Sequence, residues 1–141
     1  MTLVIDASAA LYLLASERGI EPFAKFELVS PALLWSEVTS VLNEMRWRGD
    51  LTPALAQTAF DRLLASPIRR RADEGLYRDA RDVARLLGWA KTYDAEYVAL
   101  ARALGIDLMS RDERLRRGAS RLITVVTPDE LVPPEHSTGS K

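Results

Sequence analysis

Four acidic residues stand where predicted secondary-structure elements begin, end or turn toward a buried face: Asp6, Glu37, Asp94 and Asp112. Two carboxylates about 4 Å apart repel by roughly 4 kcal/mol at an effective dielectric constant near 20. Four of them in one pocket therefore need protons or a cation. All-oxygen ligation suits Mg²⁺ or Mn²⁺, and a metal-bound water is a nucleophile at neutral pH. These residue types indicate metal-dependent phosphodiester hydrolysis.

Other catalytic groups are scarce in this chain. There is no cysteine, and the one histidine is His136, in a polar C-terminal stretch. The first absence excludes disulfides, thiolate metal sites and a cysteine nucleophile. A single histidine disfavours histidine metal centres and Ser–His–Asp catalysis. Five arginines between residues 111 and 121 offer planar contacts to phosphate, although a solvated surface explains them equally well.

Length and composition are those of one ordinary globular domain. The chain has 141 residues, 48% of them hydrophobic and 28% charged. Its apolar start lacks a basic leader segment, so we interpret it as mature structure. No apolar run approaches the roughly 20 residues that span a bilayer. We expect a cytoplasmic protein with one domain over residues 1–132 and a flexible tail over 133–141.

Strand-like and helix-like segments alternate along the chain. The alternation predicts an α/β fold, a parallel β-sheet flanked on both faces by α-helices. Strands are expected at 2–6, 27–30, 106–110 and 122–127, with an ambiguous one at 68–73, and helices at 8–17, 33–48, 53–66, 76–88, 94–105 and 112–118.

Two of the acids lie at the carboxyl ends of predicted strands. Asp6 ends the first strand, and Asp112 follows strand 106–110. Ligands of open α/β sheets bind outside the carboxyl ends of the strands. If these two strands are parallel neighbours, both carboxylates face the same rim.

The other two acids lie on predicted helices. Asp94 begins its helix on the apolar face, whereas Glu96 falls about 200° from that stripe, where we expect it to be solvated. Glu37 flanks the apolar face of its helix and has no capping role. Its structural alternative is an ion pair with Arg46 or Arg48 across the surface.

Taken one at a time, the three aspartates are explained at least as well by a structural role as by metal binding. Asp6 and Asp94 suit turns or helix caps, and Ser8 is a further cap candidate. The segment Ser110–Glu113 matches a capping box. That motif places Asp112 at the second helical position, where the helix dipole favours it.

Several segments together resemble the motifs of PIN-domain ribonucleases, and among these the VapC toxins of bacterial toxin–antitoxin pairs. The likeness runs over about residues 2–131 in the family's motif order. It implies the PIN-like fold, with the family's four acids at the positions already singled out. The matching stretches are LVIDASAAL, SEVTSVL, TYDAEYVALARALGIDLMSRDERL and LITVVTPDEL.

The resemblance implies an endoribonuclease that uses Mg²⁺ or Mn²⁺ to cut single-stranded or loop RNA, in tRNA or rRNA. Its products carry a 3′-hydroxyl and a 5′-phosphate. The resemblance also implies a homodimer that a VapB-type antitoxin neutralises by laying its C-terminal segment across the acidic pocket. An antitoxin arginine in that pocket would neutralise the same negative charge that the metal neutralises.

We assign hypothetical roles from these positions. Asp6, Asp94 and Asp112 hold the metal, directly or through water, and Glu37 binds a second ion or orients the attacking water. Hydroxyls beside the carboxylates fix their orientation. The serines in this role are Ser8 and Ser110, and the candidates for RNA phosphate contact are Arg111, Arg114, Arg116 and Arg117.

Two rival functions remain open at this point. A phosphatase with an aspartyl nucleophile needs a second Asp where Ser8 stands and a Lys near the last acid, where only Arg is present. A catalytically inactive PIN-like domain that binds RNA or protein is the other rival. The apolar helices that carry Trp35, Trp47 and Phe60 fit a dimer surface, an antitoxin surface or a simple core role.

Overall fold

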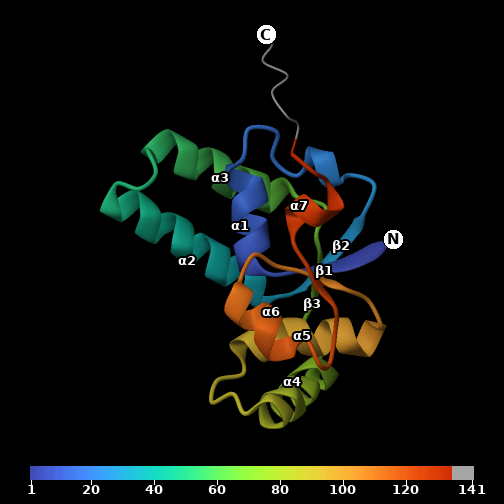
Figure 1. Cartoon of the computed structure of the whole chain (residues 1–141). Coiled ribbons are helices and arrows are strands. Elements are labelled where there is room, and N and C mark those ends of the chain that lie inside the picture. The colour runs from blue at the N-terminus through green and yellow to red at the C-terminus, as the bar shows by residue number, and fades with distance from the viewer. Residues whose placement is uncertain (135–141) are drawn as a thin grey trace.

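A five-stranded parallel sheet forms the centre of the protein (Figure 1). The computed structural model describes residues 1–134. The strand order is β3-β2-β1-β4-β5, and every neighbouring pair is parallel. This topology confirms the predicted α/β class. The strands are β1 (Thr2–Ile5), β2 (Glu27–Pro31), β3 (Arg69–Arg71), β4 (Leu108–Met109) and β5 (Val125–Val126).

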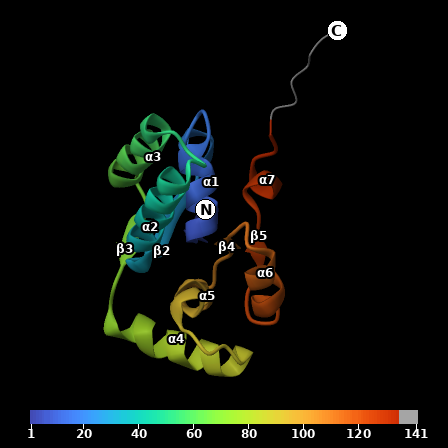
Figure 2. The same ribbon diagram turned by 90° about the vertical axis from the view of Figure 1, so that its left-hand side faces the viewer.

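Helices cover both faces of this sheet. Helices α1, α2 and α3 pack against one another on one side, and α4 packs on α5, which contacts β1, β2 and β4 from the other side (Figures 1 and 2). Helix α6 follows β4 and lies near α5 in both views. The bounds are α1 (Ala7–Ala15), the 3₁₀-helix η1 (Glu21–Phe23), α2 (Leu33–Arg48), α3 (Pro53–Ala65), α4 (Glu74–Leu87), α5 (Tyr93–Leu104), α6 (Glu113–Ala119) and α7 (Pro128–Leu131).

Local signals place the boundaries of α2 and α3 as predicted. Gly49 ends α2 with φ of 82°, a left-handed conformation that glycine adopts at little cost. The Thr52 side chain caps α3 by accepting a hydrogen bond from Leu55 N at 3.1 Å, and Pro53 takes the first helical position. These signals need no tertiary contact, which is why the sequence reveals them.

The central strand β1 lies in the middle of the hydrophobic core. Its residues Leu3, Val4 and Ile5 have no exposed surface, because neighbouring strands and both helical layers enclose them. The register pairs Ile5 with Met109 of β4. The carboxyl ends of β1 and β4 therefore meet at one rim, as the sequence predicts for Asp6 and Asp112.

The ambiguous segment 68–73 contains the edge strand β3, which is three arginines long. Short, charged edge strands resist pairing with other chains. Helices η1 and α7 were not predicted. Part of the expected tail, residues 135–141, lies outside the described residues. Within residues 1–134, no helix has both the length and the apolar character needed to cross a bilayer.

Candidate active site

Asp6 lies at the carboxyl end of β1 and is 4% exposed. It is also the N-cap of helix α1, because its Oδ1 accepts a hydrogen bond from Ala9 N at 2.9 Å. The prediction that Ser8 caps this helix is wrong. Ser8 Oγ instead donates to Asp6 Oδ1 at 2.7 Å, and Ser110 Oγ donates to Asp6 Oδ2. Three donors thus orient one buried carboxylate.

The two serines connect Asp6 to the loop before α6. Ser8 Oγ accepts a hydrogen bond from Arg111 N at 2.9 Å, and Ser110 Oγ accepts one from Asp112 N at 3.0 Å. Both hydroxyl protons therefore point toward the carboxylate. The two hydroxyl oxygens lie 3.3 Å apart, with no proton left to join them while Asp6 is ionised. This geometry fits the predicted role of both serines, which is to orient the carboxylate.

Burial is the main cause that raises the pKa of Asp6 from 3.8 to about 6. Hydrogen bonds from Ser110, Ala9 and Ser8 oppose the rise, and the negative charge of Asp112 adds to it. At neutral pH the Asp6 carboxylate is charged, and because it is buried this charge lowers the stability of the folded protein.

Asp112 is the N-cap of α6. Its Oδ1 accepts hydrogen bonds from Arg114 N at 2.9 Å and Leu115 N at 3.2 Å. The predicted capping box, with Ser110 as the cap and Asp112 at the second helical position, is therefore wrong. The reason is tertiary, because the Ser110 hydroxyl is turned toward Asp6, to which it donates, and accepts from Asp112 N and not from the N–H three residues on that a capping box requires.

Glu37 on α2 is half-buried and accepts a hydrogen bond from the Tyr97 hydroxyl on α5. Burial raises the pKa of Glu37; the Tyr97 hydrogen bond lowers it, and the charge of Asp94 raises it. The alternative of an ion pair with Arg46 or Arg48 is wrong, because Glu37 pairs with neither of these two described residues. Arg48 pairs with Glu44 and Asp50 instead.

Asp94 lies in the first turn of α5, after the N-cap Thr92, so it is not the cap of this helix. The residue as a whole is exposed, but partial desolvation of its carboxyl raises its pKa, the charge of Asp112 raises it further, and the guanidinium of Arg114 lowers it. Asp94 is thus electrostatically coupled to one acid and one base on the neighbouring helix α6.

One cleft of about 570 Å³ brings three of the predicted acids together. Asp6 does not line this cleft; it is buried and is connected to the cleft residue Asp112 through the Ser110 hydroxyl. Across residues 1–134, no three acidic side chains come close enough to form a ready-made metal cluster. The acids surround an open space rather than one point. The cleft lining includes Glu37, Trp89, Tyr93, Asp94, Asp112 and Arg114.

Close packing between α6 and the segment before α5 shapes one wall of this cleft. A Cβ atom at Gly118 would lie 2.9 Å from the Trp89 ring. Only glycine allows this approach. Trp89 can therefore lie against α6 while it lines the cleft.

Glu96 and Tyr97 are site residues that the sequence interpretation missed or misplaced. Glu96 was expected in solvent but is only 9% exposed. Burial raises its pKa, and the charge of Glu37 raises it further. Helix α5 is buried from Ala95 to Ala101 on all its sides, so helical periodicity did not reveal which side chains are enclosed. The near-continuous small and apolar run YVALA was the available signal.

The predicted RNA-contacting arginines differ in their surroundings. The Arg111 guanidinium lies over the Tyr12 ring, 4.0 Å from its centroid. Arg114 lines the cleft, and Arg117 is exposed on α6. Arg116 pairs with Glu113 on its own helix and with Glu130, and the second ion pair ties α6 to α7. Arg114 is therefore the one whose position best suits contact with a polyanion in the cleft.

The fold is that of a PIN domain. A sequence model described as the PIN domain matches residues 3–120, which is most of the chain. The chain belongs to the PIN-domain family. Ribonuclease VapC3 of Mycobacterium tuberculosis is 37% identical over 122 residues, which cover 81% of this chain and 85% of that relative. Within the family the chain is of the VapC type, as the sequence resemblance predicted.

Solved structures agree with this assignment at the level of the fold. PAE2754 from Pyrobaculum aerophilum superposes with a TM-score of 0.73 at 23% identity, covering 93% of this chain and 92% of its own. VapBC2 from Rickettsia felis, bound to a DNA fragment from its promoter, gives a TM-score of 0.62 at 11% identity, with coverages of 90% and 98%. At these identities the comparison shows the shared fold alone.

Proposed function

We propose that this protein is an endoribonuclease toxin that cuts single-stranded or loop RNA with the help of Mg²⁺ or Mn²⁺. The observation that carries the proposal is the cleft lined by Glu37, Asp94 and Asp112, with the buried Asp6 connected to Asp112 through Ser110. The name of the VapC3 relative, a ribonuclease, supports the same activity. The expected products carry a 3′-hydroxyl and a 5′-phosphate, and the expected substrates are tRNA or rRNA loops.

The donor set fits a hard divalent ion. Asp6, Asp94 and Asp112 offer only carboxylate oxygens, which Mg²⁺ and Mn²⁺ prefer. Mg²⁺ usually keeps several of its waters and binds through one or two carboxylates, so acids arranged around a space suit it better than a tight cage. When bound, the ion supplies Lewis-acid polarisation of the scissile phosphate and a water of lowered pKa.

The chain's own residues have complementary tasks in this proposal. Ser8 and Ser110 keep the Asp6 carboxylate in one orientation through their hydroxyl protons. Glu37 binds a second ion or orients the attacking water. Arg114 holds a phosphate of the RNA at the mouth of the cleft. Aspartyl-phosphate chemistry lacks its partner residues here, since Ser8 occupies the place of the second Asp.

The decisive test is cleavage of end-labelled loop RNA by the purified protein. We expect cleavage with Mn²⁺ or Mg²⁺, none after EDTA treatment, and recovery when the metal is restored. RNA binding without any cleavage in either metal would contradict the proposal and favour the catalytically inactive binding domain.

We predict that Arg114→Ala weakens RNA binding and lowers the dependence of log affinity on log salt by about one. The reason is that one phosphate contact, with its counterion release, is lost. Binding is measured by fluorescence anisotropy over a salt series. Arg78→Ala is the matched control, because Arg78 is exposed on α4, away from the cleft, and pairs only loosely with Glu74 at 3.6 Å. Equal slopes for wild type and Arg114→Ala would remove Arg114 from the binding surface.

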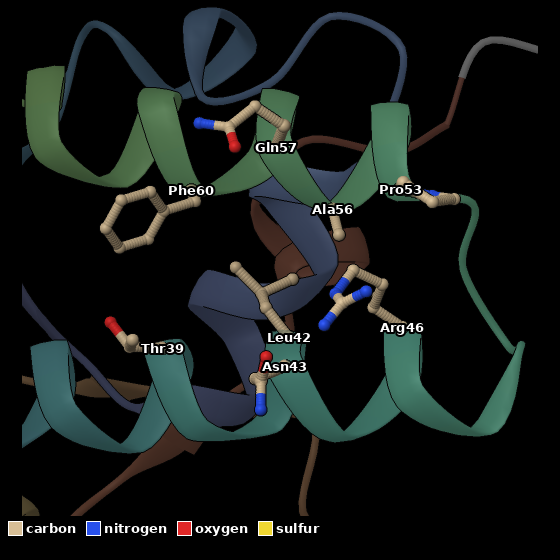
Figure 3. Close-up of a pocket in the computed structure, with 8 residues that line it drawn as sticks. All are labelled: Thr39, Leu42, Asn43, Arg46, Pro53, Ala56, Gln57 and Phe60. Atoms are coloured by element: carbon tan, nitrogen blue, oxygen red, sulfur yellow. The ribbon is translucent and has the colours of Figure 1, made fainter.

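A groove between α2 and α3 is our proposed docking place for a VapB-type antitoxin. Leu42 on α2 and Ala56 and Phe60 on α3 give it an apolar floor, and Arg46 borders it (Figure 3). Such a strip with a polar rim suits the apolar face of a partner helix. The VapBC2 structure, similar in fold, is of a toxin-type chain with its partner, which supports an antitoxin for this chain.

We predict that Thr39→Arg reduces antitoxin affinity at least about tenfold, because the longer side chain fills the groove. Thr39 lines the groove and is exposed, so the fold tolerates the change. Ser40→Arg adds the same charge at the next exposed position of α2, which does not line the groove, and serves as control. Affinity is measured by calorimetry with the antitoxin encoded beside the toxin.

The same variants test where the proposed homodimer forms. We expect light scattering to report a dimer for wild type, Thr39→Arg and Ser40→Arg alike. A monomer for Thr39→Arg alone would show that copies of this chain, and not the antitoxin, cover the groove.

A further inference from the structure

Tyr97 joins the two helical layers above the carboxyl rim of the sheet. Its helix α5 packs on β1, β2 and β4 from one side, whereas α2 packs with α1 and α3 on the other (Figure 2). The Tyr97 hydroxyl donates a hydrogen bond to Glu37 Oε1 across this rim. The two residues are 60 positions apart in the chain, so the contact is a product of the tertiary fold.

The phenol ring is fully enclosed, which makes it a rigid support. Tyr97 is 1% exposed and is among the largest fully buried side chains. A ring with two side-chain torsions loses little further freedom when it forms a hydrogen bond in a packed core. The Glu37 side chain has three torsions and is only half-buried. Without a partner its carboxylate can take several rotamers in the cleft.

We propose that Tyr97 is a positioning residue for the reaction, and that it holds the Glu37 carboxylate in its place in the cleft. The inference rests on the proposed nuclease function and assigns Tyr97 a role that acts through Glu37. The hydroxyl donates to Oε1 of this cleft residue and leaves Oε2 available to a cation or a water. Glu37 is thereby oriented by a neutral donor that does not compete with a cation.

A double-mutant cycle tests this role. Tyr97→Phe keeps the ring in the core and removes only the hydroxyl. We expect kcat for RNA cleavage at saturating Mn²⁺ to fall about 10- to 100-fold, with KM for RNA within about twofold. In a Glu37→Ala background the same change should lower kcat less than about twofold, because Tyr97 then has nothing to position. Tyr77→Phe, which removes an exposed hydroxyl from α4, is the matched control.

Unfolding in urea with EDTA present tests the contact without the reaction. We expect Tyr97→Phe to raise the unfolding equilibrium constant about tenfold in the wild-type background, as for a hydrogen bond to a charged group, and less than twofold in the Glu37→Ala background. Glu37→Asp leaves the core untouched and withdraws the carboxylate by one methylene. It should lower kcat to a similar extent as Tyr97→Phe.

Three results would overturn the inference. One is wild-type kcat for Tyr97→Phe or Glu37→Asp. Another is an equal loss from Tyr97→Phe in both backgrounds, which shows a general structural effect and leaves the nuclease proposal intact. The third is no cleavage by wild type and Tyr77→Phe, which ends the nuclease proposal and the positioning role together.

Discussion

Asp6→Asn is expected to reduce RNA cleavage at least about 100-fold while the folded protein becomes more stable at neutral pH. Activity falls because the amide supplies no negative charge to hold a cation. The measurement is the single-turnover rate of RNA cleavage with Mn²⁺ in excess. Near wild-type turnover would remove Asp6 from the active site.

The gain in stability follows from the pKa of Asp6. Its folded-state pKa of about 6 lies above the ordinary value of 3.8, so the folded protein binds the proton more tightly than the unfolded chain. Stability from this group is therefore full below pH 4 and is lost as the pH rises through 6. The loss amounts to about 3 kcal/mol for a shift of this size. Asparagine carries no such cost.

The hydrogen-bond network around residue 6 is able to accept the amide. Asparagine Oδ1 keeps the bonds from Ala9 N and Ser8 Oγ, and its Nδ2 donates to Ser110 Oγ. The displaced Ser110 proton has an acceptor in Ser8 Oγ, 3.3 Å away. Both hydroxyls, the Oδ1 atom and the Nδ2 group each keep at least one hydrogen-bond partner, so we expect the substitution to preserve the fold.

Urea unfolding of wild type and Asp6→Asn from pH 4 to pH 8, with EDTA present, checks this expectation. Wild type should lose stability relative to the variant across the interval between pH 4 and pH 6. Parallel curves for the two proteins would contradict the raised pKa, whatever the activity of the variant.

Asp112→Asn separates the structural role of this residue from its chemical one. Asparagine is as good an N-cap as aspartate, so α6 should keep its bonds from Arg114 N and Leu115 N to the cap. Cleavage should fall at least about 100-fold because a charged metal ligand is lost. Cleavage rates and thermal unfolding are measured on the same preparations.

Two further variants make this comparison specific. Asp112→Ala should lose both functions, with a cost of about 1 kcal/mol for the missing cap. Asp73→Asn makes the same charge change at the N-cap of α4, away from the cleft, and should cleave RNA like wild type. If Asp112→Asn were as active as Asp73→Asn, Asp112 would be a helix cap and nothing more.

Local features of the sequence determined the order of elements and the rim on which the acids lie. Alternating strand and helix patterns predicted the parallel α/β fold, and the boundaries at Gly49 and Thr52 follow from backbone conformation and capping, which depend on neighbouring residues alone. Asp6 and Asp112 were placed at one rim because parallel strands carry their carboxyl ends to the same edge.

Only the tertiary structure decided which partner each polar group takes. Ser110 is a suitable cap by local rules, but its hydroxyl goes to Asp6, 104 positions away, and Asp112 caps α6 instead. Glu96 is buried because α5 is enclosed on all sides, which a single helix's periodicity does not report. The hydroxyl of Tyr97 on α5 reaches Glu37 on α2 because these two helices, which cover opposite faces of the sheet, come together at its carboxyl rim. Local preferences differ by about 1 kcal/mol, and contacts between distant segments outweigh them.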